Sequence, residues 1–279
     1  MKTWWEPRGE QHLGALAARV LGSGSPIVLL HGLVGSGRYW GGAYDRLATD
    51  HTLIVPDLLG FGRSPRPAAG YGPDDHVAAL LACLNEVGAA DPALVGAHSV
   101  GSVVALRLAA RHPQRVRGVV AFGAPLYRSS AEARARLASM GPMARLFALP
   151  GRSAALACAW VCNHRRLAGK LAVLTHPRLP APVAADSVQH TWTSYSETLQ
   201  KLVLGAEAPS WRPDIRCRVW LVAGDADRVV DNGFLAELAD QHAHVRAETW
   251  PGDHHLPLRQ PERCMTVLER AAVTHPSHF

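Results

Sequence analysis

The segment Gly96-Ala-His-Ser99-Val-Gly101-Ser102 contains residues suited to nucleophilic chemistry. Small residues on both sides of Ser99 permit the sharp strand-to-helix turn that this pattern predicts. The serine would stand at the apex of that turn. Backbone N–H groups at the start of the following helix would stabilise negative charge that develops there. The expected chemistry is attack of the serine hydroxyl on a carbonyl carbon, with an acyl-enzyme intermediate.

A serine nucleophile needs a histidine as base and a carboxylate that orients this histidine. Ala223-Gly-Asp225-Ala-Asp227 follows one predicted strand and offers two carboxylates. Pro251-Gly-Asp-His254-His255-Leu-Pro follows another and offers two histidines. The order serine, acid, histidine along the chain matches one established arrangement of these three groups. Pattern alone leaves both carboxylates and both histidines as candidates.

The elements that must position these groups alternate between strands and helices, which predicts an α/β fold with a mostly parallel sheet. Short apolar runs, typical of strands buried on both faces, occupy 26–31, 52–56, 93–97, 116–122, 218–224 and 244–250. Helical patterns occupy 74–87, 100–111, 232–242 and 261–272. Residues 1–25 leave room for one or two antiparallel edge strands.

Residues 126–208 interrupt this alternation, because they contain amphipathic stretches at 131–149 and 186–204 and no strand-like run. An insertion of this length is too long for a simple crossover. We expect a helical cap or lid on a core formed by 1–125 and 209–279. Four residues of 186–204 share one helical face, either as an apolar acyl pocket or as core packing. They are Val188, Trp192, Tyr195 and Leu199.

Four motifs in chain order resemble those of the α/β-hydrolase fold superfamily, and the resemblance covers nearly the whole chain. They are His31-Gly32, Asp57-Leu-Leu-Gly-Phe-Gly-Arg-Ser64, the turn at Ser99, and the paired segments 224–230 and 251–258. The resemblance implies a doubly wound, eight-stranded type of sheet with a helical cap.

The resemblance also assigns the site. The family's acid stands three residues after the glycine that ends its strand, which implies Asp227 rather than Asp225. Its histidine stands in a G-x-H sequence, which implies His254 rather than His255. The backbone N–H groups of Leu33 and Val100 would then form the oxyanion hole.

Further residues are expected near the substrate or behind it. His31 and Asp57 are expected to brace loops rather than to react. The candidate pocket residues are Trp40, His98, Trp160, Trp192, Tyr195 and His255.

The expected function is hydrolysis of an ester or thioester bond of a small or acyl substrate. Serine at position 99 argues against haloalkane dehalogenation and epoxide hydrolysis, for which related proteins use aspartate there. A C–C bond hydrolase and a cofactor-free haloperoxidase-like enzyme are alternatives of the same class. A low-turnover ligand-binding or scaffold protein on the same fold is an alternative of another class.

Charge is unevenly distributed along the chain. The net charge is +6, and residues 126–208 contain ten basic and four acidic residues, so this segment equals the whole net charge. The excess predicts either solvated helix faces or attraction of an acidic substrate, free or carried on an acidic protein. The basic residues form no tail or aromatic-interleaved helix, which gives no support to nucleic-acid binding.

Other classes lack a sequence signal. The five cysteines form no C-x-x-C pair, and no metal-ligand set or nucleotide-binding loop is present, so we expect no metal and no cofactor. The most apolar stretch, 154–174, contains four basic or histidine residues, which argues against a membrane span. The first residues lack the apolar core of a secretion signal, and a cytoplasmic protein is expected. The sequence does not predict the oligomeric state.

Overall fold

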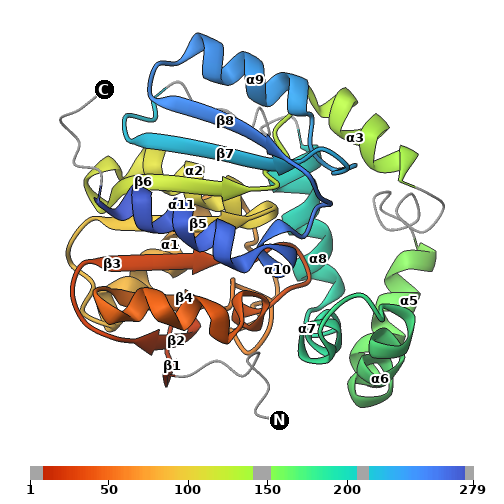
Figure 1. Ribbon diagram of the computed structural model, residues 1–279. Coiled ribbons are helices and arrows are strands. Elements are labelled where there is room, and N and C mark those ends of the chain that lie inside the picture. Colours follow the sequence, from red (N-terminus) through yellow and green to blue (C-terminus); the bar gives the residue numbers. More distant parts are fainter. Residues whose placement is uncertain (1–8, 141–151, 206–213, 274–279) are drawn as a thin grey trace.

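The computed structural model describes residues 9–140, 152–205 and 214–273, and an eight-stranded sheet forms their centre (Figure 1). The strands lie in the order β1-β2-β4-β3-β5-β6-β7-β8. Their bounds are β1 Glu10–Leu13, β2 Ala17–Leu21, β3 Pro26–Leu30, β4 Thr52–Pro56, β5 Ala93–His98, β6 Val116–Phe122, β7 Arg218–Gly224 and β8 Val245–Trp250. Every predicted apolar run is a strand, which confirms the predicted fold class.

The sheet is parallel from β4 through β8, and β1 and β2 pair antiparallel at the β4 edge. Buried parallel strands alternate their side chains between two apolar layers. In β3, for example, Val28 and Leu30 belong to one cluster, whereas Ile27 and Leu29 belong to the other. The sheet is therefore covered on both faces.

Helices α1 (Pro73–Glu86), α2 (Val100–Arg111) and α9 (Asn232–Gln241) contribute to one layer. Helix α11 (Pro261–Val273), the short α10 (Leu256–Arg259) and two 3-10 segments, η1 (Gly37–Trp40) and η2 (Gly42–Thr49), form the other. A third 3-10 turn, η3 (Pro113–Arg115), links α2 to β6. Figure 1 shows α11 in front of the sheet and α1 and α2 behind it.

Further helices follow β6 and lie beyond the carboxyl ends of the parallel strands (Figure 1). They are α3 (Ser130–Ser139), α5 (Arg152–Asn163), α6 (Arg165–Thr175), α7 (Ala181–Asp186), α8 (Trp192–Thr198) and the π-helical turn η4 (Leu199–Leu204). The predicted helix at 131–149 is seen as far as Ser139, and its positions 141–149 lie outside the described residues.

The prediction of one helix over 186–204 is wrong. Helix α7 ends at Asp186, and α8 begins only at Trp192. Thr191 caps α8, because its side-chain oxygen accepts from the Ser194 N–H while the Ser194 hydroxyl oxygen accepts from the Thr191 N–H. The interruption removes Val188 from the face that the amphipathic pattern had assigned to it.

The described residues contain no helix long and apolar enough to cross a membrane.

A buried histidine links the helices after β6 to the body of the protein. His76 of α1 is 1% exposed, and its Nε2 lies 3.2 Å from the Thr198 hydroxyl of α8. Burial lowers the pKa of His76 to about 4. The imidazole is therefore neutral in the folded protein at neutral pH.

Acid is expected to destabilise the protein through His76. In the unfolded chain a histidine binds its proton near pH 6.5, well above the folded value, so stability is full above about pH 6.5 and falls towards pH 4. The largest possible loss through this group is about 3 kcal/mol. Urea unfolding of wild type and His76→Gln between pH 7.5 and 4 measures it. An equal pH slope in both proteins would show that His76 does not contribute.

Candidate active site

The turn between β5 and α2 holds Ser99 in a rare backbone conformation. Its φ is 53° and its ψ is −125°, which is unfavourable for a residue with a side chain. The Ser99 N–H donates to the Phe122 carbonyl on β6 at 2.9 Å, and the Ser102 N–H donates to the Ser99 carbonyl at 2.8 Å. The neighbouring strand and the first turn of α2 thus hold the serine at the carboxyl end of the sheet.

Gly101 is required because α2 approaches the preceding loop closely. A Cβ atom at this position would lie 2.5 Å from the His31 carbonyl oxygen and 2.9 Å from the Leu30 carbonyl oxygen. Both atoms belong to the backbone, so neither can move aside easily. This contact explains the glycine that the sequence motif requires on the helical side of Ser99.

The variant Gly101→Ala is expected to lose about 1–3 kcal/mol of stability, because the new methyl group overlaps the backbone. Gly169→Ala in α6 is the matched control. Its Cβ would have no neighbour closer than 3.5 Å, and alanine is favoured over glycine in a helix by about 1 kcal/mol. Urea unfolding should therefore show a lower free energy of unfolding for Gly101→Ala and a higher one for Gly169→Ala than for wild type. Equal stability of Gly101→Ala and wild type would contradict the close approach.

Asp227 and His254 meet from two loops that follow neighbouring strands. The His254 Nδ1 lies 2.8 Å from the Asp227 Oδ2. The other carboxylate oxygen accepts from the Val229 N–H at 2.8 Å and from the Val230 N–H at 3.3 Å. Burial alone would raise the pKa of Asp227, but these hydrogen bonds outweigh it, and the pKa is lowered. Asp227 is therefore ionised and fixes the orientation of the imidazole ring.

Ser99 and His254 line the same cavity. Both lie in the described part of the chain, and no hydrogen bond joins their side chains there. Nucleophile–base contacts are often long before substrate binds. Gly123, with φ +63°, leaves room for the pair, because a Cβ there would lie 3.1 Å from the His254 ring and 3.3 Å from the Asp227 carboxylate.

Asp225, the second predicted carboxylate, has a different place. It is exposed, and it accepts from the Gly252 N–H at 3.0 Å. It braces the turn that leads to His254. The structure therefore separates the two carboxylates that the pattern alone left open.

Two backbone N–H groups lie beside Ser99, one from Leu33 in the loop after β3 and one from Val100 at the start of α2. Leu33 and Val100 both line the cavity beside Ser99. Within the described residues, neither of their N–H groups has a hydrogen-bond partner. Val34 has φ 53°, and it and Ser99 are the non-glycine residues with positive φ in the described chain. Such strain concentrates at functional sites, and a β-branched residue rarely accepts it.

His31 holds this loop in place. The Leu58 N–H donates to the His31 Nε2 at 2.8 Å, so the ring proton resides on Nδ1 and is donated to the Gly32 carbonyl at 2.7 Å. Burial lowers the pKa of His31, which keeps the ring neutral. Asp57 holds the adjoining turn by accepting from the Gly37 and Arg63 N–H groups. Both residues brace loops, as the sequence predicted.

The cavity has a volume of about 250 Å³ and apolar walls. It is lined by the loop after β3, the turn at Ser99, the histidine loop and the region of helices that follows β6. This region contributes Leu137, Leu179, Val183, Ser187, Leu199 and Val203, of which Leu179 and Ser187 flank α7. Sequence reasoning named only Leu199 among these, because the spacing of a leucine or valine does not distinguish a pocket wall from a core position.

Four of the six predicted pocket residues lie elsewhere. Trp40 is fully buried and packs against Tyr44 and Phe122 in the apolar layer between the sheet and α11. Trp160 is 45% exposed on α5. Trp192 and Tyr195 contact each other on α8, and neither is among the residues that line the cavity. None of these four aromatic residues lines the cavity beside Ser99.

His98 and His255 do line the cavity, together with Tyr39, which sequence reasoning missed. Tyr39 stacks on His98 with ring centroids 4.4 Å apart, and its hydroxyl lies 3.4 Å from the His255 Nδ1. Adjacent residues on η1 point to different sides, so Tyr39 faces the cavity while Trp40 enters the core. The His98 Nε2–H donates to the His254 carbonyl at 2.8 Å and thus ties the serine turn to the histidine loop.

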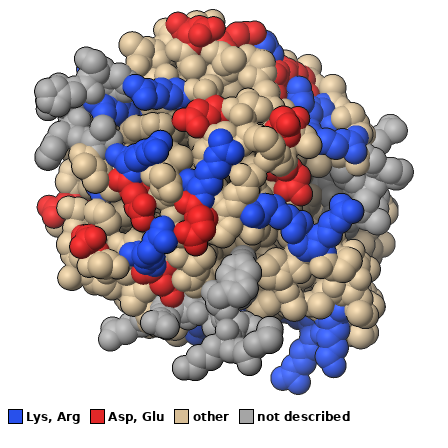
Figure 2. Space-filling view, viewed as in Figure 1, with Lys and Arg blue, Asp and Glu red and all other residues tan. Residues whose placement is uncertain are grey.

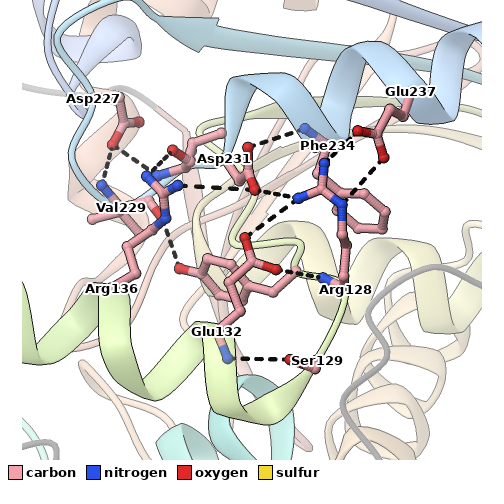
Figure 3. Close-up of polar contacts among 11 residues, drawn as sticks. Arg128, Ser129, Glu132, Arg136, Asp227, Val229, Asp231, Phe234 and Glu237 are labelled. Atoms are coloured by element: carbon pink, nitrogen blue, oxygen red, sulfur yellow. Dashed lines mark hydrogen bonds and ion pairs between the residues drawn. The ribbon is translucent and has the colours of Figure 1, made fainter.

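Helix α3 is attached to the loop that carries Asp227. Figure 3 shows Arg128 between Asp231 and Glu237, and Arg136 pointing towards the same loop. Arg128 reaches Asp231 at 2.7 Å, and Arg136 donates to the Val230 carbonyl at 2.9 Å. These contacts hold α3, and with it the cavity wall at Leu137, beside the loop that contains Asp227.

The strained turn at Ser99, the Asp227–His254 contact and the mostly parallel sheet are features of the α/β-hydrolase class of proteins. A family model described as "alpha/beta hydrolase fold" matches residues 25–260, and the chain belongs to this family.

Individual relatives agree with the family. An uncharacterized protein of Mycobacterium tuberculosis is 27% identical over 288 residues, which span 94% of this chain and 80% of that protein. The 2-hydroxymuconate semialdehyde hydrolase of Pseudomonas sp. (strain CF600) is 43% identical over 109 residues, 37% of either chain. The enol-lactonase structure from Burkholderia xenovorans LB400 superposes with a TM-score of 0.73 at 17% identity, and the match covers 95% of this chain and 100% of that one. At this identity the superposition shows the shared fold.

Proposed function

We propose that Ser99, His254 and Asp227 form a catalytic triad that hydrolyses an ester or thioester bond. The observation that carries this proposal is the 2.8 Å contact between His254 Nδ1 and Asp227 Oδ2 in the wall of the cavity into which the strained Ser99 turn opens. A structural histidine–aspartate pair would need neither the strained serine nor the two unpartnered N–H groups beside it.

The geometry defines a role for each group. Because His254 donates its Nδ1 proton to Asp227, its Nε2 lone pair is free to take the Ser99 hydroxyl proton. The serine oxygen then bonds to the carbonyl carbon, and the carbonyl electron pair moves to oxygen, where the Leu33 and Val100 N–H groups stabilise it. Collapse expels the leaving group, which receives the proton from His254. Water, deprotonated by His254, attacks the acyl-serine and releases the acid.

The cavity supports a compact, uncharged acyl group as substrate. Its volume lies just below the usual range for ligand pockets, and no Lys or Arg is among the described residues that line it. The excess of cations in 126–208 is therefore separate from the described cavity wall. Residues 126–208 would act as a cap over a core of 1–125 and 209–279, since α3, α7 and η4 supply walls of the cavity.

C–C bond hydrolysis is a second candidate, favoured by the local similarity to a 2-hydroxymuconate semialdehyde hydrolase. The serine would add to an aldehyde or ketone carbonyl, and a carbanion, protonated by His254, would leave in place of an alkoxide or thiolate. Turnover of a vinylogous 1,5-diketo acid without turnover of aryl esters or acyl thioesters would favour this candidate.

Labelling with a fluorophosphonate tests whether the serine is activated. One covalent adduct is expected on wild type, none on Ser99→Ala, and strongly slowed labelling on His254→Ala, because only an activated serine displaces the fluoride readily. Intact-protein mass spectrometry measures all three. If the folded wild-type protein remains unlabelled, the ligand-binding or scaffold alternative replaces the hydrolase.

A further inference from the structure

Helices α5 and α6 carry an apolar surface that is exposed to solvent. Among the described residues, seven large apolar side chains are strongly exposed, and five of them lie on these two helices. They are Leu156, Trp160, Leu167, Leu171 and Leu174, and we call them the α5–α6 surface. Leu156 and Leu174 are 72% and 75% exposed. Clustering of this kind marks an interaction site, because isolated exposed leucines are common but grouped ones are not.

Helix α6 buries small residues and exposes large apolar ones, the reverse of the usual arrangement in a soluble protein. The buried positions of α6 are Ala168, Gly169 and Ala172, and its small residues pack against Val188. The three leucines at 167, 171 and 174 fall at i, i+4 and i+7 and form a stripe on the exposed side. A stripe of exposed leucines of this kind is typical of a surface that contacts a partner.

The residues around the α5–α6 surface are positively charged, which favours an anionic partner. Between Glu132 and Asp186 the chain has no acidic residue and eight basic ones. Arg166 and Lys170 are exposed beside the leucine stripe. In Figure 2, Lys and Arg side chains, and no Asp or Glu, appear in the lower right of the molecule, the side on which α5 and α6 lie. The surface therefore combines apolar residues with positive charge.

We propose that the α5–α6 surface docks on an anionic lipid bilayer. A leucine stripe with flanking Lys and Arg and a tryptophan at its edge is the pattern of helices that lie in the interface of an anionic membrane. Trp160 occupies that edge, stacked on His164 at the junction of the two helices. A second copy of this chain fits less well, since a symmetric contact would bring positive surface against positive surface.

The α5–α6 surface is close in the chain to residues of the cavity wall, so docking on a bilayer would affect how substrate reaches the cavity. Leu179 and Val183 follow α6 closely in the chain and line the cavity. A bilayer on the α5–α6 surface would therefore lie near one wall of the cavity, where an acyl substrate could enter from the lipid phase. This consequence rests on the proposed function, whereas the docking itself does not.

Sedimentation with vesicles tests the docking directly. Wild type is expected to bind vesicles of equal parts phosphatidylglycerol and phosphatidylcholine and to remain in solution with phosphatidylcholine alone. The double variant Arg166→Gln/Lys170→Gln should bind the anionic vesicles about 25-fold more weakly, at about fivefold for each cation removed. The triple variant Leu167→Gln/Leu171→Gln/Leu174→Gln should not bind. A blue shift of fluorescence on vesicle addition should be smaller in Trp160→Phe.

Matched controls remove similar groups from the body of the protein. Arg111→Gln/Arg216→Gln removes two exposed cations, and Leu13→Gln removes an exposed leucine from β1. Both should bind like wild type. Thermal unfolding shows whether each variant is folded, and binding is measured by sedimentation rather than turnover, so an inactive enzyme would not alter the result.

Several outcomes would overturn the proposal. Failure of folded wild type to bind, or equal binding to the two kinds of vesicle, would exclude an anionic bilayer. A dimer in ultracentrifugation that the leucine changes convert to monomer, without vesicle binding, would assign the surface to a second copy. Competition by soluble polyglutamate that is insensitive to the leucine changes would assign it to an acidic soluble polymer or protein.

Discussion

The Ser99→Ala variant is expected to hydrolyse a short-chain aryl ester with kcat/KM about 10⁴- to 10⁶-fold below wild type. The proposed mechanism forms its covalent intermediate on this hydroxyl, and alanine leaves His254 with no proton to take from position 99. The remaining N–H donors and the cavity would retain only the stabilisation that they give to attack by water. Steady-state kinetics with purified protein measure the loss.

A stability measurement separates this result from misfolding. Ser99 has φ 53°, a conformation that glycine adopts without penalty. Ser99→Gly should therefore be inactive and yet more stable than wild type by about 1–2 kcal/mol. If Ser99→Ala or Ser99→Gly, free of contaminating wild-type enzyme, retained more than one-hundredth of the wild-type activity, the nucleophile would be a residue other than Ser99.

The Asp227→Asn variant is expected to lower kcat by about 10⁴-fold with little change in the fold. The Asp227 Oδ1 accepts from the Val229 and Val230 N–H groups, so an asparagine would keep its carbonyl oxygen on that side. Its NH₂ group would then face His254 Nδ1 and donate to it. This forces the ring proton onto Nε2, where the lone pair that must accept the Ser99 proton is lost.

Asp225→Asn is the matched control for this variant. It changes the same chemical group two residues away, where the carboxylate only accepts from the Gly252 N–H at an exposed position. Its kcat should stay within about tenfold of wild type, since one exposed hydrogen bond contributes about 1 kcal/mol. If Asp225→Asn lost more activity than Asp227→Asn, the assignment of the acid would be reversed.

Periodicity and turn residues were sufficient to predict the six strands β3 to β8 and the order of the elements along the chain, whereas they left the antiparallel edge strands in 1–25 open. Runs such as 93–97 and 116–122 are apolar throughout, because strands in the middle of a parallel sheet are buried on both faces. The turn motif at Ser99 was recognisable for a local reason as well, since Gly101 must lack a side chain to pass the His31 carbonyl. Signals of this kind are contained in neighbouring residues.

The helices after β6 were predicted less well. Amphipathic spacing ran without interruption through 186–204, although Thr191 and Ser194 cap a new helix inside it. Serine and threonine occur inside helices and at their ends, so their side chains decide a boundary only when the backbone around them is known.

Pocket walls were the least predictable feature. Tyr39 and Trp40 are adjacent aromatic residues with different surroundings. Only the tertiary structure shows that Tyr39 stacks on His98 at the cavity, whereas Trp40 fills the apolar layer between the sheet and α11. The exposure of Leu167, Leu171 and Leu174 on α6 is likewise seen only in the tertiary structure.

The sequence by itself determined the α/β class, the order of the strands along the chain and the candidates for serine, acid and base, because each depends on the types of residues a few positions apart. The tertiary structure decided which residues meet. It placed Asp227 beside His254 and Asp225 in a turn, lined the cavity with leucines and valines distant in sequence, and turned the α6 leucines to solvent. Contacts between distant segments depend on how whole elements pack, and local spacing carries no information about that packing.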